Sequence, residues 1–300
     1  MRLVLASTLS VTIVACSSSS PPAPKTAPMV PAVATPAPPV DAAPPDAAEV
    51  ELPGTKSYTT LAEAMTATIP ADARVIGIGE LHSRVDRAQV RSSLSQFTEA
   101  LPSFGANVSD LILETFITDP KCGQQAAQTT QTMETEVKRP VETKSEIAQL
   151  ADAAKAAGIQ PHAMTVTCAD YKSLAPNGQV DPLAMLTLTT RELKRIAASA
   201  VAHRDKDPQH RPWILMYGGA LHNDRFPEDA VKEWSYAAAI DQVTKNHFVE
   251  LDVIVPELAA DDAQSQKQPW FNLVQQAGSR VRVFERGERS FVIVLPKSGK

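Results

Sequence analysis

The sequence has no excess of positive charge, no long apolar run at its start and few aromatic side chains. Lys and Arg together number 29 against 34 Asp and Glu, which argues against nucleic acid as a partner. The apolar run of residues 3–15 is shorter than the roughly 20 residues that a membrane-spanning helix needs. Aromatic residues make up only 5% of the chain. We therefore expect neither a nucleic-acid-binding protein nor a membrane-spanning helix at the N-terminus.

The N-terminal apolar run is typical of a secretory signal. It ends in the four residues Ile13–Cys16, which resemble the bacterial lipobox. This resemblance implies that residues 1–15 are removed and that Cys16 becomes the lipid-modified first residue, which anchors the protein to a membrane. Ser17, in place of an acidic residue, favours the outer membrane of the bacterial envelope. The alternative is an ordinary signal peptide with an incidental cysteine.

Residues 16–54 are rich in serine, proline and alanine and contain 11 of the 24 prolines. Such a composition cannot bury enough apolar surface to fold, and proline favours extended polyproline II. We expect a lipid-anchored disordered tether here. The remaining residues 55–300 are enough for a single α/β domain.

Two cysteines remain once Cys16 is assigned to the lipid anchor. Cys122 and Cys168 both lie in the domain that is expected to be exported, where disulfides are stable. A disulfide between them is expected, and two buried free thiols are the alternative.

Apolar runs and amphipathic segments alternate along the domain. Strands are predicted at residues 75–78, 109–116, 159–166, 213–217, 247–255, 280–285 and 290–295, and helices at 60–68, 84–100, 143–157 and 182–203. Residues 121–139 are expected to form a loop or an exposed helix, and residues 169–182 a loop. The alternation is typical of a mainly parallel α/β sheet with helices on both faces. The last two strands are expected to form a C-terminal antiparallel hairpin.

One short motif ends two of the predicted strands. Gly79–His82 and Gly219–His222 both read Gly-x-Leu-His, and Glu114 follows the apolar part of another strand. Side chains two residues apart in extended backbone leave from the same face, as Glu80 and His82 would. Ligands bind such sheets beyond the carboxyl ends of their strands. We therefore expect four candidate catalytic residues to share one pocket: Glu80, His82, Glu114 and His222.

This set of side chains suits a divalent metal such as Zn²⁺, Mn²⁺ or Co²⁺, with His82, His222 and Glu80 as the predicted ligands. A metal there would acidify a water, and a remaining carboxylate would act as general base. Each residue also has a plainer interpretation. Glu80 and His82 could form a surface pair or a cap, and Glu114 could cap the next element.

The other histidines are expected to have no part in the site. His162 lies inside a predicted strand, where a hydrogen-bonded structural histidine is the more frequent case. His203, His210 and His247 have charged and polar neighbours and are expected to face solvent. Tyr217 lies in an apolar run and is expected in the core.

Three segments resemble the ChaN-like haem-binding lipoprotein family: 79–82, 111–116 and 218–225. That family belongs with the erythromycin esterases and the TIKI/TraB proteins in one α/β superfamily. The resemblance implies a parallel sheet with the Glu and His motifs in one pocket. TIKI-like members are metal-dependent peptidases with two Gly-x-x-His motifs, and the esterases hydrolyse a lactone. ChaN-like members are surface lipoproteins linked to haem uptake.

The sequence thus favours a cell-surface lipoprotein that is a metal-dependent hydrolase of a small-molecule or peptide ligand. Binding of haem or an iron compound is the alternative. The haem ligand of ChaN-like proteins is a tyrosine, for which Tyr171, Tyr217 and Tyr236 are the candidates in this chain. A third interpretation is a member that only binds a partner at the cell surface.

Overall fold

The computed structural model describes residues 54–298 except residues 138, 177, 178 and 208. The predicted signal peptide, Cys16 and nearly all of the predicted tether lie outside the described residues.

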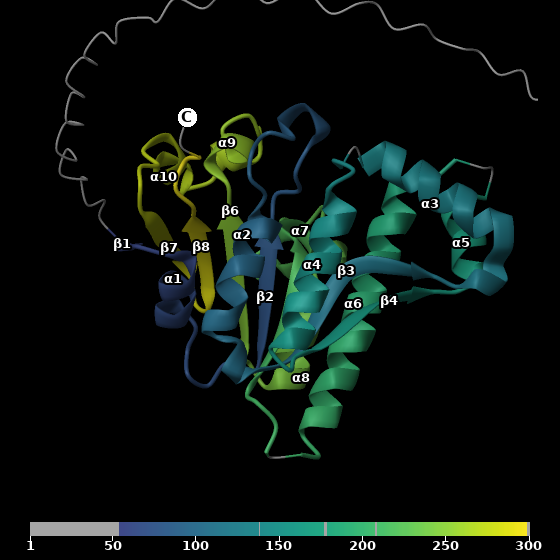
Figure 1. Cartoon of the computed structure of the whole chain (residues 1–300), viewed down its shortest axis with the longest axis horizontal. Coiled ribbons are helices and arrows are strands. Elements are labelled where there is room, and N and C mark those ends of the chain that lie inside the picture. Colours follow the sequence, from purple (N-terminus) through teal and green to yellow (C-terminus); the bar gives the residue numbers. More distant parts are fainter. Residues whose placement is uncertain (1–53, 138, 177–178, 208, 299–300) are drawn as a thin grey trace, which may run out of the picture. The chain divides into compact units, whose positions relative to one another are not determined.

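Eight strands form one sheet in the order β1-β7-β8-β6-β2-β5-β3-β4 (Figure 1). The strands are β1 (Thr55–Tyr58), β2 (Val75–Glu80), β3 (Val108–Thr118), β4 (Gln160–Val166), β5 (Trp213–Gly219), β6 (Phe248–Ile254), β7 (Val281–Gly287) and β8 (Ser290–Val294). Neighbours from β8 through β6, β2, β5 and β3 to β4 are parallel. β7 pairs antiparallel with both β8 and β1. The predicted mainly parallel α/β sheet with a C-terminal antiparallel hairpin is confirmed.

Helices cover both faces of the sheet, with α1, α2 and α4 in front of it in the view of Figure 1. The helices are α1 (Leu61–Thr68), α2 (Ser93–Ala100), α3 (Gly123–Val137), α4 (Thr143–Ala156), α5 (Cys168–Leu174), α6 (Pro182–Arg204), α7 (Ala220–Asn223), α8 (Ala237–Thr244), α9 (Pro256–Ala259) and α10 (Phe271–Gln275). Within the described residues, no helix combines the length and apolar character needed to cross a bilayer.

The central strand β2 is buried between two apolar clusters because its successive side chains point to opposite faces. Ile76 belongs to the cluster that includes Phe97 of α2 and Leu150 of α4. Val75 belongs to the other cluster, with Leu193 of α6. A strand covered on both faces reads as a continuous apolar run, which is why β2 was predictable from sequence.

Local signals in the sequence account for several element ends. Thr60 and Glu63 form a capping box at the start of α1, with the Glu63 N–H donating to Thr60 Oγ1 at 3.1 Å. Gly158, just beyond α4, has φ +70°, a conformation that glycine adopts without strain. Pro161 lies in β4, the edge strand of the sheet, as its missing N–H requires.

The predicted helix at 84–100 is wrong in its first half. α2 begins only at Ser93, because the Ser92 hydroxyl accepts the Ser95 N–H at 2.9 Å and caps the helix there. Val85–Arg87 form a single 3₁₀ turn, in which Val85 is 60% exposed.

Two further segments differ from or refine the sequence interpretation. Residues 169–182 were expected as a loop but include most of α5, which a capping box of Thr167 and Asp170 begins. Residues 121–139, interpreted as a loop or an exposed helix, contain α3. Cys122 and Cys168 precede and begin these two helices and lie at disulfide-bonding distance, with their Cα atoms 5.0 Å apart.

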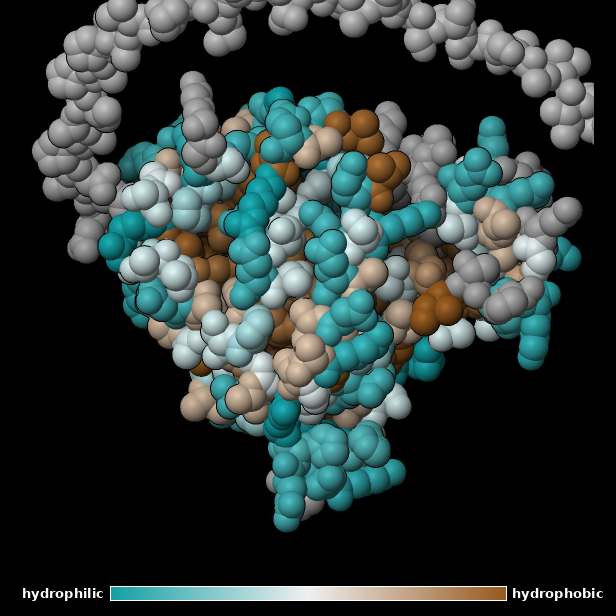
Figure 2. Space-filling view, in the orientation of Figure 1, coloured by the Kyte–Doolittle hydropathy of each residue, from teal (hydrophilic) through white to brown (hydrophobic). Residues whose placement is uncertain are grey.

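The apolar surface of the domain is broken up. Figure 2 shows brown patches on one face separated by polar side chains. In the described part of the chain, the large apolar side chains that are exposed come from separate elements: Val85, Ile117, Val141, Leu183, Phe226 and Val243. The polar side chains at the strand ends are therefore the stronger candidate for a functional site.

Candidate functional site

The carboxyl ends of β2, β3 and β5 bring the predicted residues to one edge of the sheet. β2 ends on Glu80, which lies opposite Gly219 of β5 in the parallel register. Glu114 comes from β3, on the other side of β5. Three of the four predicted side chains meet here: Glu80, His82 and Glu114.

His82 is held by a buried carboxylate. Its Nδ1 lies 3.0 Å from Glu80 Oε1, and the other oxygen, Oε2, accepts a hydrogen bond from the Tyr217 hydroxyl at 2.6 Å. Burial, together with the adjacent charge of Glu80, raises the pKa of Tyr217 well above its usual value, so Tyr217 remains a hydrogen-bond donor. The side chain of Glu80 is only 7% exposed. Tyr217 thus fixes Glu80, and Glu80 fixes the imidazole.

The second nitrogen of His82 faces a guanidinium. Arg139 Nη2 lies within hydrogen-bonding distance of His82 Nε2. Guanidinium can only donate, so Nε2 is the nitrogen that carries the lone pair. Nδ1–H is then the donor to Glu80. The two neighbours therefore select the tautomer in which Nε2 can accept a proton.

Glu114 lies between positive groups. Its Oε2 accepts the Gly219 N–H at 2.6 Å, and its Oε1 lies 3.7 Å from His82 Nε2 and 3.6 Å from Arg139 Nη2. Burial acts to raise the pKa of this carboxyl. The electrostatic effects of His222, His82 and Arg139, together with the hydrogen bond from the Gly219 N–H, outweigh burial, and the pKa lies below its usual value. Glu114 is therefore ionised at neutral pH.

His222 reaches the same edge but is held by other partners. Its Nδ1 lies 2.8 Å from the Trp234 carbonyl oxygen and 3.0 Å from the hydroxyl of Thr190 on α6. Because a carbonyl only accepts, Nδ1 carries the proton and Nε2 the lone pair. Among the described residues, no hydrogen bond or ion pair joins His222 to the other three predicted residues. It acts on the pocket through its effect on the pKa of Glu114.

Both motif glycines are required by close packing. A Cβ at Gly79 would lie 2.2 Å from Asp252 Oδ1, and a Cβ at Gly219 would lie 2.9 Å from His82 Nε2. At Gly218 a Cβ would lie 2.4 Å from Glu114 Oε2. The polar side chains at the strand ends therefore occupy the space that side chains of the motifs would fill.

These residues enclose a small cavity. Its volume is about 20 Å³, room for about one water molecule. The polar side chains described above line it together with apolar side chains of β3, α2 and α4. The lining residues are Glu80, His82, Leu94, Leu113, Glu114, Arg139, Thr143, Ile147, Tyr217 and Gly218.

As arranged here, the predicted ligands do not fit a metal ion. Glu80 uses one oxygen for His82 and the other for Tyr217, and His222 is bonded elsewhere. The remaining pair, His82 and Glu114, provides two donors, fewer than the three protein ligands of a catalytic zinc site. In the described part of the chain, no group of three or more His, Cys, Asp or Glu side chains is placed to hold a metal. Metal binding stays a prediction.

Comparisons with known proteins do not identify a family. No family model and no curated protein matches the chain. One solved structure, that of the type III effector HopBA1, is similar at 12% identity with a TM-score of 0.41, over 80% of this chain and 94% of that one. ChaN-like membership stays a prediction.

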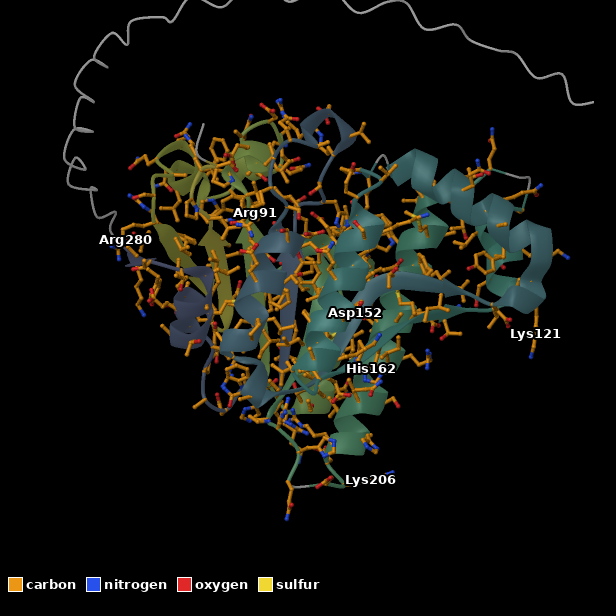
Figure 3. The ribbon with its side chains drawn as sticks, viewed as in Figure 1. Arg91, Lys121, Asp152, His162, Lys206 and Arg280 are labelled. Atoms are coloured by element: carbon orange, nitrogen blue, oxygen red, sulfur yellow. A yellow bond between two sulfur atoms is a disulfide. The ribbon has the colours of Figure 1, made fainter. Side chains whose placement is uncertain are left out.

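The remaining histidines lie away from the pocket. His162 lies near the start of the edge strand β4 (Figure 3), and its Nε2 is 2.7 Å from Oδ1 of Asp110 on β3. His210 pairs with Asp207, and the His203 ring contacts the His210 ring. His247 pairs with Asp72.

Sequence reasoning missed two members of the pocket. Tyr217 lies in the core as predicted, but its hydroxyl also reaches Glu80. This second role follows from its position opposite Ile78, two residues before the Glu80–Gly219 pair on the same face. Arg139 lies in the connection between α3 and α4, where no periodic pattern indicates its contacts.

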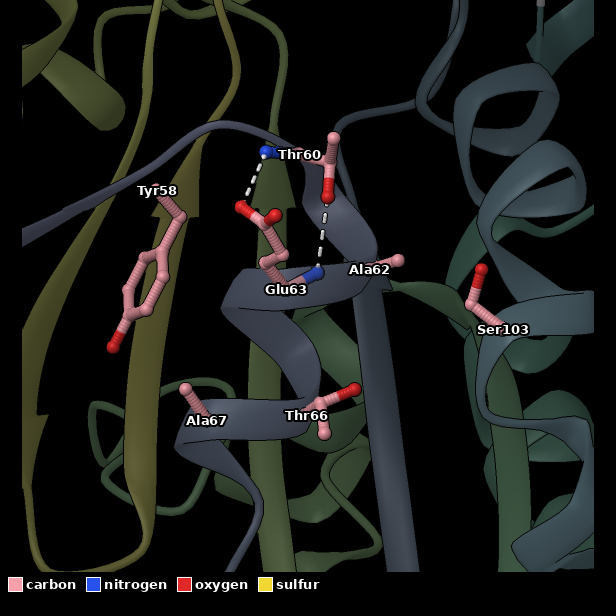
Figure 4. Close-up of a pocket in the computed structure, with 7 residues that line it drawn as sticks. All are labelled: Tyr58, Thr60, Ala62, Glu63, Thr66, Ala67 and Ser103. Carbon is pink, nitrogen blue, oxygen red and sulfur yellow. Dashed lines mark hydrogen bonds between the residues drawn. The ribbon is translucent and has the colours of Figure 1, made fainter.

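A larger, open groove lies beside α1. Its volume is about 580 Å³, within the range of small-molecule sites, and Figure 4 shows its lining residues: Tyr58, Thr60, Ala62, Glu63, Thr66, Ala67 and Ser103. It carries none of the predicted site residues.

Proposed function

We propose that this chain is a lipid-anchored cell-envelope hydrolase, ChaN-like in fold, in which His82 is the general base that activates a water. The observation that carries the proposal is the pair of His82 with the buried Glu80 carboxylate, in which Nδ1 lies 3.0 Å from the carboxylate and the imidazole lines the cavity. A carboxylate behind an imidazole fixes its tautomer and stabilises the imidazolium that forms.

The reaction uses the chain's own groups. His82 Nε2 takes a proton from the water, and the water oxygen forms a bond to the acyl carbon of an ester or amide. The acyl–leaving-group bond then breaks, and the leaving group takes the proton back from the imidazolium. Glu114, ionised and 3.7 Å from Nε2, stabilises the imidazolium while it holds that proton.

Site-directed variants test this assignment on a panel of chromogenic esters, lactones and peptides. Because a general base contributes roughly 10²–10⁴-fold, His82→Ala should lower kcat/KM by at least ~100-fold. Glu80→Gln should also lower kcat, since the imidazole loses its ionic partner. The matched control is His210→Ala, because His210 is likewise bonded to an Asp carboxylate but at the surface.

Full activity in His82→Ala would refute the role of His82. Inactivity of both the wild type and Arg139→Ala, which frees His82 Nε2, on the whole panel would refute the hydrolase. Metal dependence is tested on the same protein. The present arrangement predicts no loss of activity with a chelator. Loss with chelator and recovery with Zn²⁺, Mn²⁺ or Co²⁺ would restore the metal-dependent mechanism expected from sequence.

Haem binding is the second candidate, and the groove beside α1 supports it. Of the chain's four tyrosines, Tyr171, Tyr217 and Tyr236 are at most 5% exposed, whereas Tyr58 is half-buried on the wall of the groove. A tyrosine ligand to haem would therefore be Tyr58. A haem absorption band that Tyr58→Phe abolishes and His82→Ala leaves unchanged would establish this function. No such band on titration with haem would remove it.

A further inference from the structure

The guanidinium of Arg139 fills a slot between two hydrogen-bond acceptors of the pocket. Nη2 contacts His82 Nε2 and lies 3.6 Å from Glu114 Oε1. The two acceptor atoms are 3.7 Å apart. Arg139 Nε is buried and has no hydrogen-bond partner among the described residues. The contacts of this arginine are therefore concentrated at one end of its side chain, inside the slot.

The slot matches a cation that carries several N–H groups. Two carboxylates, Glu80 and Glu114, line the cavity against the single positive charge of Arg139. With neutral imidazoles the pocket remains acidic even when the arginine is in place. Both groups that face the slot, Nε2 and Oε1, accept hydrogen bonds, so guanidinium or primary ammonium fits and an anion is repelled.

Arg139 differs from the rest of the pocket in its origin. Glu80, Tyr217 and Glu114 come from strands of the sheet, whereas Arg139 comes from the connection after α3. Its side chain is 23% exposed, against 7% for Glu80 and 13% for Glu114. The cation, which like His82 lies outside the strands, can therefore be exchanged without displacing a strand.

We propose that the slot is an inhibitory binding site for N–H-rich cations, with Arg139 as its built-in occupant. The ligands are guanidinium and primary ammonium groups, whether on a small amine or on a basic peptide side chain. A cation there occupies the lone pair of His82 Nε2, so cation binding and activation of water exclude each other. This last consequence rests on the proposed hydrolase, whereas cation binding does not.

Direct binding of methylguanidinium chloride tests the site without hydrolysis. Titration is followed by calorimetry and by the side-chain NMR signals of His82 in the wild type, Arg139→Ala and Arg139→Lys. A tethered group competes at an effective concentration of roughly mM, so Arg139→Ala should bind the probe at least ~10-fold more tightly than the wild type. Arg139→Lys refills the slot and should bind as weakly as the wild type.

Two controls identify the site. Tetramethylammonium has the same charge but no N–H group and should not bind. Arg139→Ala/Glu114→Gln should bind methylguanidinium about tenfold more weakly than Arg139→Ala, or worse, because a charged hydrogen-bond partner is lost. Arg139→Gln replaces Arg139→Ala if that variant does not fold. Acetyl-arginine-amide in place of methylguanidinium shows whether a peptide side chain reaches the slot or only a small cation does.

Three results would each overturn the proposal. The first is equal binding of methylguanidinium and tetramethylammonium, and the second is an affinity for methylguanidinium that Glu114→Gln leaves unchanged. The third is no binding of methylguanidinium to Arg139→Ala at tens of mM. If the cation binds as expected and no ester, lactone or peptide is hydrolysed, the proposed hydrolase fails and the cation site stands. If hydrolysis occurs and the cation does not bind, the reverse holds.

Discussion

Replacing Tyr217 with phenylalanine removes one hydroxyl that supports the buried Glu80 carboxylate. The hydrogen bond is 2.6 Å long, typical of O–H donation to a charged oxygen. Hydrogen bonds to charged groups contribute about 1.5–3 kcal/mol, so Tyr217→Phe should lower the free energy of unfolding by about 2 kcal/mol. For a domain of this size that corresponds to a fall in Tm of about 4–8 °C.

A matched control is available in Tyr236→Phe. Tyr236 is equally buried, at 3% exposure against 5% for Tyr217, but its hydroxyl has no hydrogen-bond partner among the described residues. Removing it breaks no hydrogen bond and relieves the desolvation of a buried hydroxyl, so Tyr236→Phe should be no less stable than the wild type. Urea unfolding at neutral pH, with equal m-values, makes the two variants comparable.

A double-mutant cycle then isolates the pair. Tyr217 can still donate to an amide oxygen in Glu80→Gln, so the cycle measures the difference between a charged and a neutral acceptor, about 1 kcal/mol. Additive effects within about 0.5 kcal/mol would refute the contact as a source of stability. So would a Tyr217→Phe variant no less stable than Tyr236→Phe.

Three further predictions concern other parts of the chain. The native, unreduced protein should contain no free thiol at Cys122 or Cys168. The disulfide closes a loop with a sequence separation of 46, so its reduction should lower the free energy of unfolding by about 4 kcal/mol. Two titratable thiols in the native protein would contradict this. Burial, and next the neighbouring Glu250, raise the pKa of Asp252 well above its usual value of 3.8, so the folded state keeps a proton that the unfolded chain releases. Asp252→Asn should therefore be more stable than the wild type at pH 7, and this difference in unfolding free energy should shrink as the pH falls towards 3.8. Equal unfolding free energies of the two proteins at pH 7 would count against the prediction. Cys16→Ser should leave the precursor uncleaved and without acyl mass, and unchanged mass and membrane fractionation would exclude the lipid anchor.

The sheet and much of the pocket were predictable because their signals are local. Runs such as Val75–Ile78 identify buried strands, and a parallel sheet gathers their carboxyl ends, which brings Glu80, His82 and Glu114 together. His222 shows the limit of this reasoning. It reaches the same edge, but α7 turns its ring towards Trp234.

The rest of the site depends on contacts between distant segments. Arg139 has no sequence pattern around it, and only the packing of α4 against the sheet brings it to His82. Two sequence signals conflict at the start of α2. Apolar residues at helical spacing extend back to Val85, but the Ser92 cap begins the helix at Ser93. The capping box of α5 was readable in the sequence and was overlooked between two polar stretches.

The three glycines at the strand ends also bear on how the protein can change over generations. At Gly79, Gly218 and Gly219 even one added methyl group would collide with a polar side-chain atom at the strand ends. The floor of the pocket therefore tolerates almost no sequence drift, so adaptation to a new ligand has to arise in the walls. Those walls are formed, outside the sheet, by Arg139 in the connection after α3, Leu94 of α2, and Thr143 and Ile147 of α4. A mutational library directed at these four positions would explore specificity while leaving His82 and Glu80 in place.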